Sequence, residues 1–484
     1  MSKLFRPVLF VCGIIAWIMA GFLLIPAFYS LYAGDMEHQA FFIASAGVAA
    51  CGVFMMAPGY APPFTLNARQ LYLLTGLSWL FLSFFSASPL VLVSHPMSLT
   101  DAVFESVSGI TTTGSTVLTH LADLPPSILL WRSMLQWIGG FGVIGMAITI
   151  LPFLRVGGMR LFQTESSDWS DKSMPRFQAM ARGLLVTYVG LTLLCAGSYW
   201  LAGMTPFDAI NHAMTTVSTG GYATDDSSMG RFSLTILWIS IFFMMLGGLP
   251  FTLYIRFLHS RRLSALRDEQ VIAFIVIVLS LVVALSLQRI FTGNTDESAF
   301  SILTHSAFNI VSVITTTGFA SQDYTQWGMF SIAMFFFVTF MGACSGSTSG
   351  GMKIFRFQLS WLFLREQMQK LIHPNGVFTV RYNGKPVTDD IMGSAVAFSF
   401  LFFLVLTVAT FLLVLIGLDF ITALTGAATA LTNVGPGLGD MIGPAGNFAA
   451  VPDSGKWLLS FIMVLGRLEL LTLMVLFTPI FWRG

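Results

Sequence analysis

The sequence predicts an all-α integral membrane protein, in which four pseudo-symmetric span–pore-helix–span repeats surround a central pore behind an N-terminal pair of transmembrane helices. Three observations predict this fold. Of the 484 residues, 55% are hydrophobic and only 10% are charged, whereas soluble domains average about 25% charged residues. Apolar runs of ~20 residues, enough to cross a ~30 Å hydrocarbon core, recur from end to end. Four short segments between these runs share one pattern of hydroxyl residues and glycine.

Ten apolar stretches are expected to cross the membrane. They cover 8–32, 38–58, 71–95, 128–155, 177–203, 232–258, 270–291, 326–342 continuing to 366, 390–418 and 456–482. The first stretch has no small-residue cleavage site, so we expect it to be retained. We divide the chain into the N-terminal helix pair, 1–68, and four pore repeats, 69–172, 173–267, 268–386 and 387–484.

Basic residues gather on alternate sides of these spans. They lie at Lys3 and Arg6, at Arg69, and within 155–182, 256–267 and 353–385. The positive-inside bias therefore places these segments and both chain ends in the cytoplasm. The opposite loops are acidic and could concentrate cations at a pore entrance, although ordinary solvated loops would look the same. The acidic residues are Asp35, Glu37, Asp123, Asp225, Asp226, Asp296, Glu297, Asp323 and Asp453.

The internal repeat is the most informative feature of the sequence. The four segments cover 101–115, 208–222, 305–319 and 422–436, and align on Gly114, Gly221, Gly318 and Gly435. Six positions before each glycine stands a hydroxyl residue: Ser108, Thr215, Ser312 or Thr429. Thirteen positions before it, three copies have a residue that often caps a helix, namely Asp101, Asp208 and Thr422; the third copy has His305 there. We expect each short helix to begin at this cap.

Each segment is too short to cross a bilayer and too apolar for a solvated loop, which favours a re-entrant helix followed by irregular backbone. Such backbone persists at membrane depth only where it is buried in protein or lines a watery cavity. Rings of backbone carbonyls can replace the hydration shell of an ion, and glycine reaches the backbone angles that this requires. The expected filter residues are Thr111, Thr112, Thr113, Gly114, Ser218, Thr219, Gly220, Gly221, Thr315, Thr316, Thr317, Gly318, Thr432, Asn433, Val434 and Gly435.

Selection by this filter would rest on dipoles. The C-terminal end of each short helix carries a partial negative charge that favours a cation. The segments contain no ring of carboxylates, which calcium and magnesium prefer, so the pattern favours a weakly hydrated monovalent ion. For any single segment, the alternative is a helix-packing surface built from small residues.

A second polar segment interrupts the stretch 326–366. Glycine and serine lower helix propensity there, so we expect a helix that breaks into a loop below the filter. The residues concerned are Gly342, Gly346, Ser347, Thr348, Ser349, Gly350, Gly351 and Lys353. The alternative is a continuous helix that uses Gly342, Gly346 and Gly350 as its contact face.

Arg467 lies near the middle of the last expected span, where an arginine faces a cavity or a partner. It is either a positive charge in the pore beneath the filter or one half of a structural ion pair, with Glu469 or another carboxylate. Arg132 and Arg231, near the outer starts of two spans, are interpreted as interfacial or structural. His212 and His305 are interpreted as packed or capping residues.

These residues resemble the TrkH/KtrB superfamily of potassium transporters, and the extra N-terminal helices point to its TrkH branch. The resemblance covers essentially the whole chain, and its specific matches are the four filter glycines and the segments 139–142, 431–439 and 466–470. It implies potassium (K+) as the transported ion, because glycine stands in all four filters, and no organic cofactor in this chain. It further implies that the loop 342–353 is a gate, that the chain forms a homodimer in a bacterial cytoplasmic (inner) membrane, and that a cytosolic TrkA-type ring that binds nucleotide regulates it.

Other classes of function fit the sequence less well. A sodium- or proton-coupled cation symporter would share these features. An organic-solute carrier with broken helices is usually built on inverted repeats, whereas the positive-inside pattern recurs here in the same sense after each repeat. The spans contain no paired carboxylates, histidine cluster or nucleophile–base set, so we expect neither an enzyme nor a nucleic-acid-binding protein.

Overall fold

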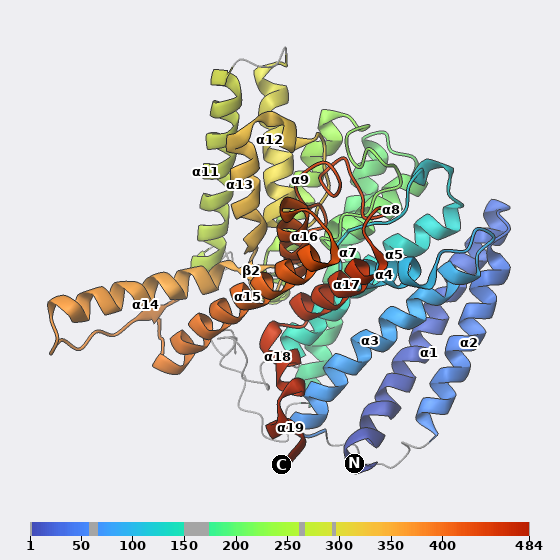
Figure 1. Ribbon diagram of the computed structural model, residues 1–484, viewed down its shortest axis with the longest axis horizontal. Helices are drawn as coiled ribbons and strands as arrows, with labels where there is room; N and C mark the ends of the chain where they lie inside the picture. Colours follow the sequence, from blue (N-terminus) through green and yellow to red (C-terminus); the bar gives the residue numbers. More distant parts are fainter. Residues whose placement is uncertain (1, 58–65, 150–173, 261–266, 293–296, 484) are drawn as a thin grey trace.

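A computed structural model describes residues 2–57, 66–149, 174–260, 267–292 and 297–483. Much of the basic segment 155–182, part of 256–267 and Asp296 lie outside these ranges. The N-terminal pair consists of α1 (Ser2–Ala33) and α2 (His38–Met56), which pack on each other and on α3. Both chain ends lie at the same end of the molecule (Figure 1).

Four units follow, and in each a short helix stands between longer ones. The first contains α3 (Ala68–Leu92), α4 (Leu99–Ile110), the 3-10 turn η1 (Leu121–Asp123) and α5 (Pro126–Thr149). The second contains α7 (Met174–Leu201), α8 (Pro206–Val217), α9 (Leu234–Gly248) and α10 (Phe251–Ser260). The third contains α11 (Glu269–Thr292), α12 (Ala299–Ile314), η4 (Tyr324–Trp327), α13 (Met329–Phe340) and α14 (Ile354–Ile372). The fourth contains α15 (Asp389–Ile416), α16 (Phe420–Thr432), α17 (Asp453–Arg467), α18 (Leu470–Met474), η5 (Val475–Phe477) and α19 (Pro479–Arg483).

The all-α class is confirmed, and the described strands are only two residues long. β1 (Met341–Gly342) pairs in parallel with β2 (Met352–Lys353), which closes the loop between α13 and α14. β3 (Arg381–Tyr382) pairs antiparallel with β4 (Lys385–Pro386) after α14. The first of these pairs holds the two ends of the expected gating loop together.

Three of the ten expected spans are not single straight helices. Within the described residues, seven helices are long and apolar enough to cross a membrane, and two bent pairs raise the number to nine. The stretch 232–258 bends by 90° between α9 and α10, where Pro250 disfavours a helical conformation at the preceding Leu249. The stretch 456–482 bends by 111° after Arg467, at Glu469, which has a φ of 63°. In the stretch 326–366, helix α13 ends at Phe340 and helix resumes only at Ile354.

Two large hydrophobic clusters hold the units together. One joins α4, α5, α15, α16 and α17 to the N-terminal pair, and the other joins α7, α8 and α9 to α11, α12 and α13. The first cluster therefore comes mainly from units 1 and 4, and the second mainly from units 2 and 3. Helix α14 extends away from the other helices (Figure 1).

Glycines in the second span of three units bring that span against the end of a short helix. A Cβ atom on Gly139, Gly247 or Gly466 would lie 3.1 Å or closer to the carbonyl oxygen of Ile110, Val217 or Leu431, respectively. These carbonyls stand four positions before the aligned glycine of their segment. At Gly139 and Gly466 only a residue without a side chain allows this approach, and at Gly247 a side chain would make its neighbours shift. The spans therefore pack directly against the bases of the filter segments.

Candidate ion-binding ring and gating loop

Each short helix is capped at its N-terminus by a side chain that accepts a backbone hydrogen bond. The four caps are Ser98, Thr205, Ser298 and Asp419. The expectation that Asp101, Asp208 and Thr422 are the caps is therefore wrong by three residues, and His305 lies inside a helix that begins at Ala299. Asp101 and Asp208 instead accept a hydrogen bond from the hydroxyl of the preceding cap, at 2.8 and 2.9 Å. An acidic residue in the first turn suits the positive end of the helix dipole.

After each short helix the backbone takes the same path. Two residues adopt a positive φ, first at 52–57° in Thr112, Thr219, Thr316 and Asn433, and then at 79–109° in the four aligned glycines. The residue between them donates its N–H to the carbonyl five positions earlier, at 2.8–3.1 Å: Thr113 to Ser108, Gly220 to Thr215, Thr317 to Ser312 and Val434 to Thr429. A left-handed non-glycine residue costs about 1–3 kcal/mol, so the surrounding protein must hold this conformation in every unit.

The four glycines lie around one centre. A Cβ atom on Gly114 would come within 3.0 Å of the carbonyl oxygen of Gly220 in unit 2. The same holds for Gly221 and the carbonyl of Thr317, for Gly318 and that of Val434, and for Gly435 and that of Thr113. The sequence of neighbours runs through units 1, 2, 3 and 4 and returns to unit 1, so the segments form a closed ring. We call these four segments, 111–114, 218–221, 315–318 and 432–435, the glycine ring.

Side chains join units 1 and 4 across the ring. The hydroxyl of Ser115 donates to the carbonyl of Gly435 at 2.9 Å, and the side-chain amide of Asn433 donates to the hydroxyl of Thr113 at 2.9 Å. These bonds span 320 residues of sequence. They fix the segment that is last in the chain against the first.

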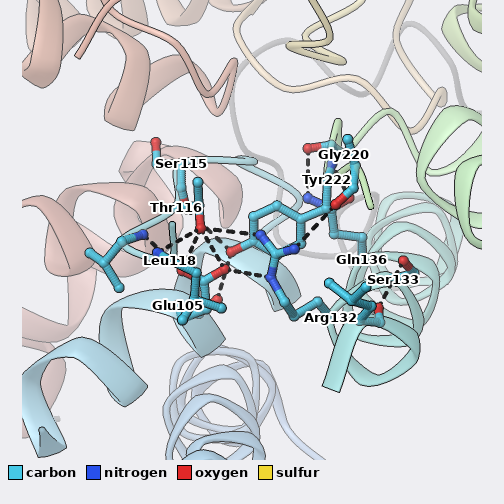
Figure 2. A network of polar contacts seen from close by, with 12 residues as sticks. Glu105, Ser115, Thr116, Leu118, Arg132, Ser133, Gln136, Gly220 and Tyr222 are labelled. Carbon is cyan, nitrogen blue, oxygen red and sulfur yellow. Dashed lines mark hydrogen bonds and ion pairs between the residues drawn. The ribbon is translucent and has the colours of Figure 1, made fainter. Parts of the chain in front are cut away.

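A buried ion pair supports the ring in unit 1 (Figure 2). The guanidinium of Arg132, on α5, lies 2.8 Å from the carboxylate of Glu105, on α4, and both side chains are almost completely buried. Arg132 also donates to Thr116 and to the carbonyl of Ala223, and its guanidinium lies over the ring of Tyr222. Because Arg132 is almost completely buried, it fits the structural interpretation and not the interfacial one, and it ties the segment after filter 1 to the segment after filter 2.

The other units use different side chains at the matching place. Glu105 accepts hydrogen bonds from Thr116 and from the N–H of Val117. In unit 3, Asn309 contacts both the hydroxyl and the N–H of Ser321. In unit 4, the hydroxyl of Thr425 pairs with the N–H and the carbonyl of Leu438. Units 1, 3 and 4 thus each anchor the chain after the filter to their own short helix.

Of the two histidines of the short helices, His212 is packed, as expected, and His305 is half-buried. The ring of His212 is buried between Phe232 and Phe319, and its Nδ1 contacts the carbonyl of Asp208 at 2.9 Å. Nδ1 of His305 contacts the hydroxyl of Ser321 at 2.9 Å. Within the described part of the chain, no group of three or more histidine, cysteine or acidic residues could hold a metal ion.

Several outer acidic side chains form ion pairs. Asp101 pairs with Lys456 at 2.6 Å, and Glu297 pairs with Arg289 at 3.5 Å. Arg231, which is about one-third exposed, pairs with both Asp208 and Asp225. Of the acidic residues that were expected to concentrate cations, Asp225 and Glu297 thus each lie beside an arginine. At the start of α16, hydrogen bonds from Thr422 lower the pKa of Asp419 and keep this cap ionised.

The loop between α13 and α14 contacts the glycine ring where the short helices end. Thr348 donates its hydroxyl to the carbonyls of Val217 and Gly247, at 3.1 and 3.0 Å. The N–H of Gly350 donates to the hydroxyl of Thr316 at 2.6 Å, and a Cβ atom on Gly350 would collide with the carbonyl of Thr432. The loop is non-helical from 341 to 353, so the alternative of a continuous helix with a glycine face is wrong.

A small cavity of about 30 Å³ lies between this loop and the end of α17. Its lining includes Gly346, Gly350, Lys353, Gly466 and Arg467. Arg467 is buried, and its three guanidinium nitrogens have no hydrogen-bond partner among the described residues. Lys353 donates to the carbonyl and the hydroxyl of Ser349 in the same loop. The cavity has room for about one water molecule.

Glu469 does not pair with Arg467. Its carboxylate contacts the guanidinium of Arg356, on α14, and Arg356 also lies over the ring of Phe398 at 3.7 Å. The expected alternative of an Arg467–Glu469 pair is therefore wrong, because the helix ends at Arg467 and the left-handed Glu469 turns toward α14. This ion pair joins the helix that follows the loop to the bend of the last span.

Three residues of this site escaped sequence reasoning. Glu105 and Arg356 are charged residues in or beside apolar stretches. Burying a charge there is costly, so their presence was the available signal of a functional role. Gln136 is a polar residue in the span α5, and its side chain reaches the carbonyl of Gly220 and the N–H of Tyr222. Nothing local marks it, because its partners lie 84 and 86 residues away.

The fold and the site together define a membrane protein of the pore-loop class, with four span–short-helix–span units around a single ring of backbone. The family comparison then specifies the class: a sequence profile described as TrkH, cation transport protein, matches residues 37–483. The chain belongs to this family, whose members are transport proteins and not enzymes.

Relatives support the same assignment over the full length. The chain is 52% identical over 479 residues to the Trk system potassium uptake protein TrkI of Halomonas elongata, covering 99% of this chain and 97% of that one. It is 36% identical over 488 residues to the TrkH protein of Salmonella typhimurium, covering 99% of each. The crystal structure of the potassium transporter TrkH from Vibrio parahaemolyticus matches with a TM-score of 0.92 at 34% identity, covering 99% of this chain and 100% of that one.

Proposed function

We propose that this protein takes up potassium across a bacterial cytoplasmic membrane through a gated pore. The observation that carries the proposal is the closed ring of four glycines, each facing a backbone carbonyl of the next unit. In this proposal the ring is the selectivity filter, and its backbone oxygens replace the hydration shell of the ion. The similarity to relatives that are named potassium uptake proteins supports potassium as the ion.

The loop 342–353 and Arg467 form the gate in this proposal. The loop bonds to the inner side of the ring through Thr348 and Gly350. The guanidinium of Arg467, which has no hydrogen-bond partner in the described part of the chain, and the ammonium of Lys353 lie beside it. A cation leaving the ring would meet both a backbone obstruction and two positive charges, so conduction requires the loop and the bent last span to move.

The proposal includes a homodimer, a cytosolic nucleotide-binding ring of the TrkA type and termini in the cytoplasm. Helix α14 supports the first two, since it extends from the helical bundle (Figure 1) and exposes Trp361, Leu364 and Met368. The position of both termini at one end of the molecule supports the third. The pore repeats are assigned to 69–172, 173–267, 268–386 and 387–484, with the helix pair in 1–68.

A sodium- or proton-coupled symporter and an organic-solute carrier are the alternatives. Carriers of both kinds commonly use a buried carboxylate as the coupling group. Two buried or partly buried carboxylates near the ring and the gate, Glu105 and Glu469, are each held in an ion pair with an arginine. This pairing favours the pore over the coupled carriers.

Rubidium uptake into proteoliposomes tests the proposal, with Gly318→Ser as the decisive variant. A serine Cβ at this position would collide with the carbonyl of Val434 and would occupy a backbone with a φ of 82°. We expect uptake to fall tenfold or more, because a tenfold change corresponds to about 1.4 kcal/mol and the strained backbone alone costs about 1–3 kcal/mol. Gly203→Ser is the matched control, because Gly203 has a φ of 107° but open space around it. Normal rubidium uptake by Gly318→Ser would refute the pore.

A further inference from the structure

We infer that Gln136 is a specificity-determining residue of the glycine ring. Its side chain, which comes from α5, occupies the place where a side chain of residue 220 would lie. The inference rests on the proposed function and extends it to one further residue. Gln136 lies outside the four repeated segments, yet it is the side chain that contacts the ring carbonyl of unit 2 (Figure 2). The geometry assigns it to the filter of the neighbouring unit and not to its own.

Gly220 is exceptional among the four residues that precede the aligned glycines. The other three are Thr113, Thr317 and Val434. All four donate the same hydrogen bond to the carbonyl five positions earlier. Gly220 also lies outside the set of positive-φ residues, unlike Gly221. Its backbone conformation therefore does not require glycine, and the reason for a glycine at this position must lie in the space around it.

Gln136 fills that space. A Cβ atom on Gly220 would lie within 3.0 Å of Cδ, Oε1 and Cβ of Gln136. From this position Nε2 of Gln136 donates to the carbonyl of Gly220 at 2.6 Å, and Oε1 accepts from the N–H of Tyr222 at 3.0 Å. Gln136 is completely buried, so no water replaces these bonds if the amide is removed.

The equivalent residues of two other units cannot make these bonds. Gly139, Gly247 and Gly466 are equivalent, because each packs on the end of a short helix. Three positions before them stand Gln136, Met244 and Met463, all buried. Methionine has no hydrogen-bond donor. The carbonyls of the four residues that precede the aligned glycines form one layer of the ring. Within the described residues, only the carbonyl of Gly220 in this layer accepts a side-chain hydrogen bond.

This bond lowers the field that the ring presents to an ion. A carbonyl that accepts from an amide shares its lone pairs with a partial positive charge. A layer of three free carbonyls and one hydrogen-bonded carbonyl attracts a small cation less strongly than four free ones, and field strength is one basis for discrimination between potassium and sodium. Gln136 therefore shifts the preference of the pore toward the larger ion.

The test compares rubidium and sodium fluxes of Gln136→Met and the wild-type chain in proteoliposomes. Methionine keeps the length of the side chain and removes the donor. We expect the ratio of rubidium to sodium flux to fall about fivefold, on the scale of one lost hydrogen bond. Ser133→Ala is the matched control on the same helix, because the hydroxyl of Ser133 bonds only to the carbonyl of Leu129; its ratio should stay at the wild-type value.

A paired substitution separates selectivity from folding. Gly220→Thr alone should abolish uptake, because its side chain would collide with Gln136. Gln136→Met combined with Gly220→Thr reproduces the methionine and threonine found at equivalent places in other units, so it should restore rubidium uptake while keeping the lowered ratio.

An unchanged ratio in Gln136→Met, or a double variant no better than Gly220→Thr alone, would overturn the role of Gln136. If Gln136→Met yields no folded protein, the ratio of the double variant decides. Absence of rubidium uptake by the wild-type chain would instead refute the proposed function.

Discussion

Single residues within the membrane show how the site is supported. Glu105 and Arg132 are both ionisable and almost completely buried, and they are paired at 2.8 Å. Burying two charges is costly, and their attraction offsets this cost only with good geometry and further hydrogen bonds. Thr116, Val117 and Ala223 supply those bonds. Because these partners lie directly after filters 1 and 2 in the chain, the pair also fixes the segments that follow both filters.

Removing one member of this pair should be more harmful than removing both. Arg132→Met leaves a buried carboxylate without its charge partner, which costs about 3–5 kcal/mol. Arg132→Met combined with Glu105→Gln should recover a substantial part of that loss. Thermal unfolding of the purified protein in detergent measures the difference. Arg231→Met serves as the control, since its partly exposed pairs contribute about 1 kcal/mol or less. Equal destabilisation by the single and double variants would contradict this account.

Among the elements, the interrupted spans matter most for function. Helix α13 stops at Phe340, α9 bends before Pro250, and α17 stops at Arg467. The loop 341–353 fills the space that these interruptions create beneath the ring. It is largely buried, with hydrogen bonds from Thr348 to the end of α8 and from Gly350 to the ring. Ala343, Cys344 and Met352 belong to the hydrophobic clusters.

Thr348→Val tests whether these bonds keep the loop in place. Valine has nearly the shape of threonine but cannot donate to the carbonyls of Val217 and Gly247. Loss of this hydrogen bond, which one hydroxyl shares between two carbonyls and which is worth about 1 kcal/mol, should raise basal rubidium uptake of the chain alone by about fivefold. Thr410→Val is the control, since the hydroxyl of Thr410 bonds only within its own helix. Basal uptake equal to that of the wild type would show that other contacts hold the loop.

For the whole molecule, the ring joins four segments that are far apart in sequence. Each glycine is limited by a carbonyl of the next unit, so a change in one unit acts on its neighbour. The ring is therefore sensitive to packing throughout the protein.

The spacing around the ring predicts a graded response to alanine. A Cβ atom would lie 2.7 Å from the nearest carbonyl oxygen at Gly435, and closer than this at Gly114, Gly221 and Gly318. All four positions have positive φ, so each alanine carries a similar backbone cost of about 1 kcal/mol. We expect Gly435→Ala to retain the most rubidium uptake of the four variants, measured in the same vesicles. A variant order in which Gly435→Ala is the most damaging would contradict the ring geometry.

The sequence by itself determined the membrane class, the four repeats and the positions of the aligned glycines. These features are local: hydrophobic runs reflect the bilayer, and each segment has its own pattern of hydroxyl residues and glycine. The broken helix at 342–353 was also predictable, because glycine and serine weaken a helix wherever they gather. The caps were placed one turn late, because Ser98 and Thr205 precede equally suitable acidic residues.

Only the tertiary structure decided which distant residues meet. The contact of Gln136 with Gly220 joins residues 84 positions apart, and the ion pair of Glu469 with Arg356 joins residues 113 positions apart. Such contacts leave no periodic trace in the sequence, since each partner alone is an ordinary polar residue in or near an apolar span. Their positions follow from how the four units close around a common centre, and this closure is a property of the assembled fold.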